Sequence, residues 1–241
     1  MTDTPKRRQD KPGWAYDIEG YAIAQEPLLR TIKYSGKEVG IVTRCRYDAE
    51  VLNAPQMLFI DIDLGDPRYE DGCFVKTEKE ALDGLRDAVK SPMKWLPKYG
   101  FSIERDQWID RHRRGLGFRV YRTAGGLRYI CTTHQWRAGR DFEDDLMRFV
   151  YTDYRYRRIC RSQQTFRVRL TPKPWRIRQE YIEHFGRGEW RNKSGEGIAR
   201  TAKYVTTVGS DMVLPEFGDL LSVHDSTTLA LMDRGVKTYL A

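Results

Sequence analysis

Residues 57–66 read Met-Leu-Phe-Ile-Asp-Ile-Asp-Leu-Gly-Asp, a short apolar segment that carries carboxylates. Because successive side chains of a β-strand point to opposite faces, Ile60 and Ile62 share one face, and Asp61 and Asp63 share the other. An uncompensated charge is costly to bury, and two like charges on one face repel each other. A divalent cation removes both penalties, so this segment predicts a strand with a candidate metal site.

The elements that follow this strand predict an α+β fold. Thr77 and Glu80 have the spacing of a capping box, and apolar residues at helical spacing continue until just before Pro92. The remaining predicted elements are strands at 118–123 and 127–132, a helix at 141–151 and a strand at 165–171. This order is the βαββαβ arrangement of a ferredoxin-like or RRM-like palm. We therefore expect one antiparallel sheet with both helices on one face and the other face open.

Glycine marks the predicted hairpin between the two middle strands. Ala124-Gly125-Gly126 joins them, and glycine is expected to supply the positive φ that a tight hairpin turn requires. The same two glycines allow backbone N–H groups to approach a phosphate closely. A glycine-rich turn with no ligand explains the motif equally well.

The chain divides into three predicted regions. Residues 1–12 are expected to form a flexible basic arm. Residues 13–175 form a core, in which Val39–Cys45 is a candidate strand and the palm occupies about 55–175. Residues 176–241 are expected to be a helical region that packs on the core, with helices at 174–185, 197–205, 216–221 and 226–240.

Composition limits the class of protein. The 241 residues carry a formal net charge of +8, which favours polyanionic partners and nucleic acid first. The four cysteines form no Cys-x-x-Cys pair, as is usual for reduced intracellular cysteines. No apolar stretch approaches the roughly 20 residues needed to cross a bilayer, so we predict a cytoplasmic protein without a membrane partner.

The acidic pair predicts metal chemistry. Mg²⁺ or Mn²⁺ would bind Asp61 and Asp63 together with triphosphate oxygens, as in nucleotidyl transfer. Such a site usually adds a third carboxylate, for which Asp153 is the candidate and Asp66 the second choice. A solvated acidic strand on a half-exposed sheet is the alternative explanation.

Basic residues near the acidic pair are candidate phosphate ligands. Strand alternation places Arg167 and Arg169 on the same open face as the two aspartates. The full set of candidate nucleotide- or phosphate-binding residues is Arg122, Gly125, Gly126, Arg128, Arg167, Arg169 and Lys173.

A second basic set lies between 154 and 178, where acidic residues are nearly absent. Arginine binds phosphate in a fork geometry, and aromatic rings stack on unpaired bases. A solvated charged face is the usual alternative. The candidate nucleic-acid-binding residues are Arg155, Arg157, Arg158, Arg161, Trp175 and Arg176.

The order of these motifs resembles the archaeo-eukaryotic primase (primase-polymerase) superfamily, as a divergent bacterial-type member. Its first motif is an apolar strand that ends in Asp-x-Asp, matched by Leu58-Phe-Ile-Asp61-Ile-Asp63. Its second is a small-residue turn into a strand with a nucleotide-contacting histidine, where this chain has Arg128. Its third is a carboxylate before a basic segment, which Asp153 and 161–173 resemble. The resemblance implies catalytic, metal-binding Asp61, Asp63 and Asp153, with nucleoside triphosphates and a nucleic-acid strand as substrates.

Four functions remain open from the sequence. The first is a metal-dependent nucleotidyltransferase of primase-polymerase type. The second is a non-catalytic module that binds single-stranded nucleic acid, which Arg128 in place of histidine favours. A two-metal nuclease fits the acidic pair equally well. A nucleotide-sugar glycosyltransferase fits Asp-x-Asp but not the strand order, since it calls for a larger parallel sheet.

Overall fold

The fold is mixed α+β, with two four-stranded antiparallel sheets. The computed structural model describes residues 26–45, 48–65, 75–95, 115–173, 179–184, 187–192, 198–232 and 238–241. The predicted basic arm and three candidate residues, namely Asp66, Trp175 and Arg176, lie outside these ranges. None of the helices in the described ranges is long and apolar enough to cross a membrane.

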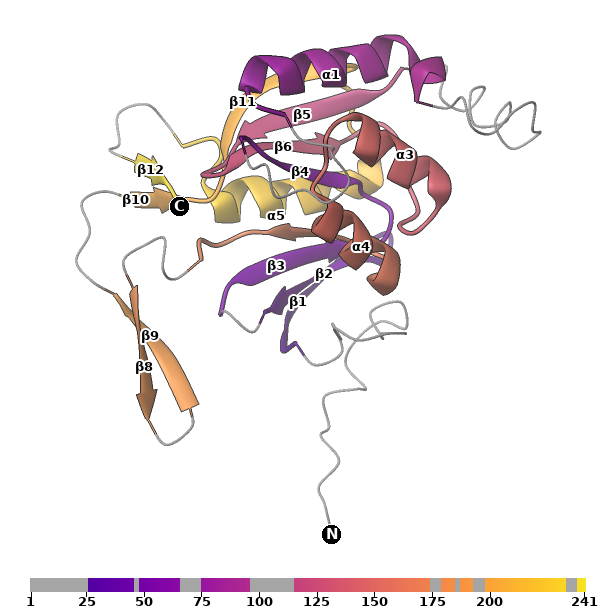
Figure 1. The fold of residues 1–241 in the computed structure, drawn as a ribbon. Helices are drawn as coiled ribbons and strands as arrows, with labels where there is room; N and C mark the ends of the chain where they lie inside the picture. Colours follow the sequence, from indigo (N-terminus) through magenta and orange to yellow (C-terminus); the bar gives the residue numbers. More distant parts are fainter. Residues whose placement is uncertain are drawn as a thin grey trace.

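The central sheet contains the acidic strand at one edge. Its order is β11-β5-β6-β4, so β4 pairs with β6 (Figure 1). The hairpin of β5 and β6 is as predicted, whereas β11 is an addition. The bounds are β4 (Phe59–Asp63), β5 (Gly117–Arg122), β6 (Gly126–Cys131) and β11 (Lys203–Gly209).

The last predicted palm strand belongs to a second sheet. That sheet has the order β1-β2-β3-β7, in which β7 pairs antiparallel with β3 and not with β4. The strand expected at Val39–Cys45 is confirmed as β2. The bounds are β1 (Leu28–Tyr34), β2 (Lys37–Arg44), β3 (Glu50–Ala54) and β7 (Phe166–Arg169).

Side-chain and loop groups occupy the outer edge of β4, where β7 was expected to pair. The Tyr156 hydroxyl donates to the Phe59 carbonyl at 2.9 Å and accepts from the Arg167 amide at 3.3 Å. The Asp153 amide donates to the Asp61 carbonyl at 3.4 Å. These contacts satisfy carbonyls that a strand ladder would otherwise use. The two sheets therefore meet along a seam beside β4.

The helices that follow β4 and β6 are partly as predicted. Helix α1 (Glu78–Lys90) begins with the predicted Thr77–Glu80 capping box and buries Ala81, Leu85 and Ala88. Helix α3 (Asp141–Phe149) ends two residues early, because Tyr151 has a left-handed φ of 65°. The basic segment then forms a further helix, α4 (Tyr154–Gln163), that the sequence analysis did not predict.

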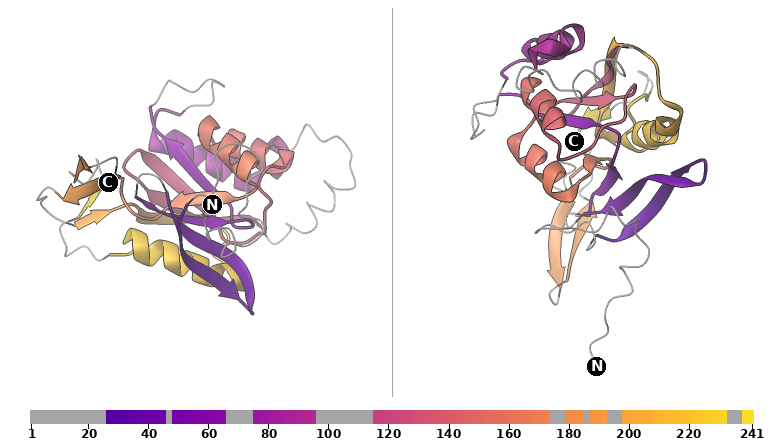
Figure 2. Two further views of the ribbon diagram at one scale, coloured as in Figure 1. Left: turned by 90° about the horizontal axis from the view of Figure 1, so that it is seen from below. Right: turned by 90° about the vertical axis from the view of Figure 1, so that its right-hand side faces the viewer.

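The face predicted to be open is covered. Arg122 contacts Glu78 of α1, while its neighbour Tyr121 packs edge-on against His224 of α5 (Gly218–Thr228). Since successive strand residues point to opposite faces, α1 and α5 lie on opposite faces of the central sheet. Figure 2 (right) shows α5 on one side of the sheet and α3 on the other.

The C-terminal region is not the predicted set of helices. In its described part α5 is the only α-helix, and α5 begins within the expected 216–221 segment. The other segments form strands, one of which joins the central sheet. Besides β11, these are β8 (Gln179–His184), β9 (Arg187–Asn192), β10 (Ile198–Arg200) and β12 (Thr238–Leu240).

The hairpin glycines do not have the predicted role. Neither Gly125 nor Gly126 has a positive φ. A Cβ built on Gly126 would lie 2.1 Å from the Ile62 carbonyl oxygen. Gly126 is therefore required because β6 approaches β4 too closely for any side chain. Its N–H donates to the Thr123 hydroxyl at 3.2 Å, so it is already engaged within the turn.

We expect Gly126→Ala to lower the free energy of unfolding by about 2 kcal/mol, because the added methyl meets backbone that cannot rotate away. Urea denaturation monitored by circular dichroism measures the change. Gly218→Ala is the matched control: Gly218 begins α5 with a φ of −54° and open space around its Cβ position. That variant is expected to be stabilised by up to about 1 kcal/mol. Equal midpoints for the two variants would contradict the close-approach explanation.

Candidate phosphate-binding site

A cavity of about 310 Å³ lies at the seam between the two sheets. The acidic strand, the hairpin turn, the start of α4 and the end of β7 all contribute to its wall. The charged residues that line it are Asp61, Asp63, Arg128, Asp153, Arg155, Arg169 and Lys173. The sequence analysis named all seven as site residues, and the fold brings them together.

A bidentate ion pair joins Asp61 to Arg128 inside this cavity. Arg128 Nε and Nη2 donate to the two oxygens of Asp61 at 2.7 and 3.1 Å. The Arg128 side chain is 1% exposed and that of Asp61 35% exposed. Burial by itself raises the pKa of Asp61, but the charge and hydrogen bonds of Arg128 outweigh burial and lower it. Asp61 is therefore a carboxylate at neutral pH.

Further acceptors hold the guanidinium of Arg128 in place. Its Nη1 donates to the Arg169 carbonyl at 3.0 Å and lies 3.3 Å from His224 Nε2. Because a guanidinium has no acceptor, His224 Nε2 must accept, and its Nδ1–H donates to Asp225 at 2.9 Å. Burial lowers the pKa of His224, which keeps the ring neutral. Arg128 thus connects β4, β6, β7 and α5.

The other two candidate metal ligands stand beside this pair. Asp63 is exposed at the end of β4. Asp153 caps α4, its carboxylate accepts from the Arg155 amide at 2.7 Å, and its own amide contacts the Asp61 carbonyl. The three aspartates are therefore neighbours, as the sequence analysis required of a shared site.

The donor set does not fit a two-metal centre in this arrangement. Among the described residues, no group of three His, Cys, Asp or Glu side chains is arranged to hold a metal ion. Both oxygens of Asp61 face the Arg128 guanidinium, which already neutralises the carboxylate. A metal cation at Asp61 would have to compete with the buried Arg128 guanidinium, which makes four hydrogen bonds to Asp61, Arg169 and His224.

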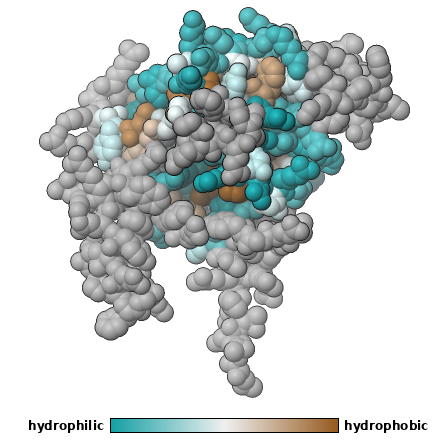
Figure 3. Space-filling view, viewed as in Figure 1, coloured by the Kyte–Doolittle hydropathy of each residue, from teal (hydrophilic) through white to brown (hydrophobic). Residues whose placement is uncertain are grey.

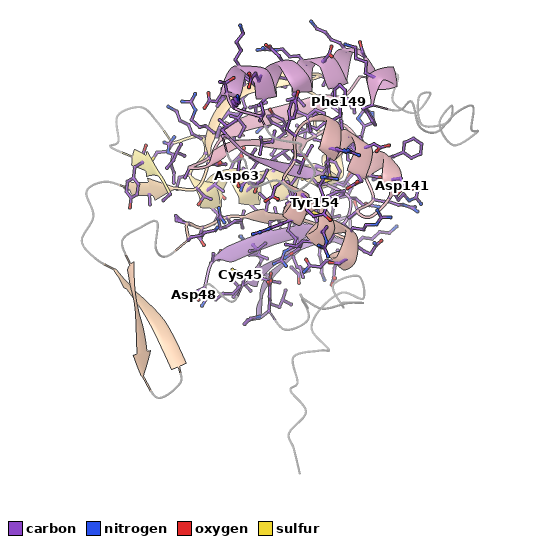
Figure 4. All side chains as sticks on the ribbon, in the orientation of Figure 1. Cys45, Asp48, Asp63, Asp141, Phe149 and Tyr154 are labelled. Atoms are coloured by element: carbon purple, nitrogen blue, oxygen red, sulfur yellow. The ribbon has the colours of Figure 1, made fainter. Side chains whose placement is uncertain are left out.

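Besides Asp61 and Arg128, the cavity wall carries three cations and two carboxylates. Arg155, Arg169 and Lys173 are the cations, and Asp63 and Asp153 are the carboxylates. Where described residues reach the surface in Figure 3, that side of the molecule is mostly hydrophilic. Figure 4 labels Asp63 and Tyr154 near the centre of this side. The cavity wall is thus charged and slightly basic.

Three other candidate arginines form ion pairs away from the wall of the charged cavity. Arg122 forms a bidentate pair with Glu78 at 2.6 Å on the opposite face of the sheet. Arg157 is buried and binds Asp144. Arg167 is buried against Glu26 and Gln163, so it does not project onto an open face beside the aspartates. These three are not available for phosphate in this structure. Gly126 also does not line the cavity, whereas Gly125 does.

Tyr156 and Ile159 are site residues that the sequence analysis missed. Both residues line the charged cavity. They also line a neighbouring, largely apolar cavity of about 430 Å³, together with Val51 and Val168. Their spacing of three on one helix is the only sequence signal for them. His224 was equally unforeseeable, because it reaches Arg128 from 96 residues away.

Comparisons with known proteins add no relative. No model of a known protein family matches the chain, and neither a curated protein nor a solved structure matches it. The resemblance to primase-polymerases therefore remains a hypothesis that rests on motif order.

We expect Arg128→Met to lower the free energy of unfolding by about 3 kcal/mol, because it leaves Asp61 and His224 without their buried partner. Arg122→Met is the control, since it removes an equally well-formed but exposed pair and should cost less than about 1 kcal/mol. Urea denaturation at pH 7 measures both. Similar losses for the two variants would show that burial does not decide the value of the Arg128 pair.

The same pair predicts a pH dependence. Asp61 has a lowered pKa in the folded state, so its contribution is complete above the ordinary value of 3.8 and is lost as pH falls below it. Without Arg128, burial raises the pKa of Asp61, so the variant regains stability by protonating this carboxyl at a higher pH than the wild type does. We therefore expect the stability difference between wild type and Arg128→Met to be largest at neutral pH and to shrink as the pH falls toward 4. A difference that stays constant or grows as the pH is lowered from 7 to 4 would contradict the lowered pKa of Asp61 in the wild type.

Proposed function

We propose that this protein binds the phosphates of a single-stranded nucleic acid in the seam cavity and that it is a non-catalytic module. The Asp61–Arg128 pair carries the proposal. In this pair a buried, permanently charged arginine binds the carboxylate that a metal-dependent enzyme would need for its cation. The remaining cations of the cavity then act on phosphate rather than on a metal-bound triphosphate.

The charge pattern supports phosphate over other anions. Arg155 and Arg169 offer planar donor groups for bidentate contacts, and Lys173 adds a mobile ammonium. Tyr154 at the start of α4 adds an aromatic ring, and the guanidinium groups of Arg157 and Arg158 lie 5.5 and 5.7 Å from its centre. Cationic grooves with aromatic neighbours are the usual basis of single-strand binding. The net charge of +8 agrees with a polyanionic partner in the cytoplasm.

The strand order supports a primase-like palm in part. The sequence β4-α1-β5-β6 and the spatial order β5-β6-β4 agree with three strands of a ferredoxin-like βαββαβ unit. β7 is linked to β4 through Tyr156, whose hydroxyl donates to the Phe59 carbonyl and accepts from the Arg167 amide. We interpret the fold as such a palm in which the fourth strand, β7, pairs with β3 of the other sheet instead of with β4.

A second candidate is the metal-dependent nucleotidyltransferase of primase-polymerase type. The convergence of Asp61, Asp63 and Asp153 on one cavity favours it. This activity would use nucleoside triphosphates with Mg²⁺ or Mn²⁺. It requires that a cation compete with Arg128 for Asp61.

Binding is tested by fluorescence anisotropy with a labelled single-stranded octamer, as DNA and as RNA. We expect Arg169→Ala or Lys173→Ala to weaken binding severalfold and to reduce the salt slope by about one. Lys79→Ala, on an exposed site of α1 away from the cavity, is the control and should leave Kd unchanged. Equal effects of all three substitutions would mean that the cavity does not bind the strand.

Asp63→Asn separates the two candidates, because the predicted effects have opposite signs. For a binding module, loss of a negative charge from the cavity should tighten binding or leave it unchanged without any divalent cation. For a nucleotidyltransferase, the same substitution should abolish nucleotide incorporation on primed and unprimed templates with Mg²⁺ or Mn²⁺. Cation-dependent incorporation by the wild type, lost in Asp63→Asn, would replace the first candidate by the second.

A further inference from the structure

A cavity of about 530 Å³, which we name the second cavity, lies at the other end of the central sheet from the seam cavity. It is built where β6 ends and α3 begins, and it shares no lining residue with the seam cavity. Its walls are mainly polar, and the residues that matter here are Gln56, His134, Arg137, Arg140 and Glu143. The function proposed above does not use any of them.

Glu143 gives this cavity a buried group with unused hydrogen-bonding capacity. The side chain is 7% exposed, and its Oε1 accepts from the Arg137 amide at 2.8 Å. Its Oε2 is buried and has no hydrogen-bond partner among the described residues. An unsatisfied oxygen in this position costs stability unless a ligand or water supplies the partner.

The part of the rim that precedes α3 is cationic, and Glu216 adds a second carboxylate to the cavity wall. Arg137 and Arg140 are exposed at its mouth, just before the first turn of α3. His134, which is buried, lies edge-on to the Trp136 ring at 6.4 Å and forms part of the wall. A ligand suited to this cavity has a planar polar part for the interior and negative charge at the rim.

Helix α4 connects the two cavities. Its ten residues span about 15 Å. Asp153, the N-cap, lines the seam cavity. At the other end a Cβ on Gly139 would lie 2.3 Å from Gln164 Nε2, and Arg161 pairs with Asp141 at 3.5 Å. The far end of α4 therefore touches the loop that carries Arg140.

Exposed arginines mark the surface of this helix. Arg155, Arg158 and Arg161 are all exposed and follow one another at a spacing of three, so they form one stripe along α4. In Figure 4, the labels of Asp63, Tyr154 and Asp141 follow one another from left to right across the front of the molecule. Arginines of α4 thus extend from Arg155, which lines the seam cavity, to Arg161, which pairs with Asp141 next to Arg140.

We propose that a single nucleic-acid strand runs along α4 from the seam cavity and places one unpaired nucleobase in the second cavity. Glu143 Oε2 meets the polar edge of this base, and Arg137 and Arg140 contact the phosphates on either side of it. The inference rests on the proposed function, because it extends the strand that the seam cavity binds. It adds a base-binding site and a minimum length, since a dinucleotide is too short to reach both cavities.

The experiment compares a labelled dinucleotide with a labelled octamer, each as DNA and as RNA, by fluorescence anisotropy. We expect Arg140→Glu to raise Kd for the octamer about tenfold and to leave the dinucleotide unchanged. Arg169→Glu should weaken both ligands. Arg86→Glu is the matched control, because Arg86 is an exposed arginine of α1 and the charge change is the same. It should not distinguish between the two lengths.

A separate variant tests the proposed contact between Glu143 and the base. Glu143→Gln keeps the acceptor for the Arg137 amide, so the fold is preserved, but it changes the group that meets the base. We expect at least a threefold change in the ratio of affinities for adenine, cytosine and thymine octamers. An octamer with a single abasic nucleotide at the position that weakens wild-type binding most should no longer distinguish Glu143→Gln from wild type.

The outcomes separate the two proposals. If the wild type binds neither the dinucleotide nor the octamer, the proposed function fails and this inference fails with it. If the octamer binds through Arg169 while Arg140→Glu and Glu143→Gln behave like Arg86→Glu, only the second site is overturned.

Discussion

The arrangement of the two sheets depends on the hydrogen bonds of one buried group, the guanidinium of Arg128. It lies on β6, binds both oxygens of Asp61 on β4, and reaches the carbonyl of Arg169 on β7. A cation that is 1% exposed must have nearly all of its donors satisfied. The elements that supply these acceptors, including α5 through His224, are therefore held in a fixed relation to one another.

That requirement shapes the chemistry of the cavity. Because Arg128 neutralises Asp61, the wall keeps a cationic excess from Arg155, Arg169 and Lys173. The fixed positions of Arg128 and Asp61 pre-organise the cavity, which lowers the entropy cost of binding an extended ligand. A carboxylate cluster poised for metal would need the opposite balance, with like charges held together until a cation arrives.

Local patterns in the sequence predicted the local structure well. The capping box of α1, the hairpin and the alternation of β4 depend on neighbours a few residues apart, so the sequence specifies them directly. The seven charged residues of the cavity were named from local patterns, namely two carboxylates in an apolar strand, a further carboxylate after a predicted helix, and basic residues near them.

The errors arise from partners far apart in the sequence. Nothing near Arg122 or Arg167 in the sequence indicates their ion pairs with Glu78 and Glu26, which lie 44 and 141 residues away. The prediction for the C-terminal region was wrong for a different reason. A helix was predicted at 197–205, although Val205 and the three residues that follow it are β-branched and favour the strand they form. α5 also ends at Thr228, because Leu229 adopts the left-handed conformation, which a single sequence does not specify.

The split between β4 and β7 explains why a cavity exists at all. In a continuous palm sheet, backbone hydrogen bonds would join these strands about 4.8 Å apart and leave no room between them. Here Tyr156 and Asp153 satisfy the outer carbonyls of β4 instead, so β7 is free to pair with β3. The seam that results is lined by side chains rather than by a ladder. A ligand can therefore reach the Asp61–Arg128 pair from the side where a neighbouring strand would otherwise lie.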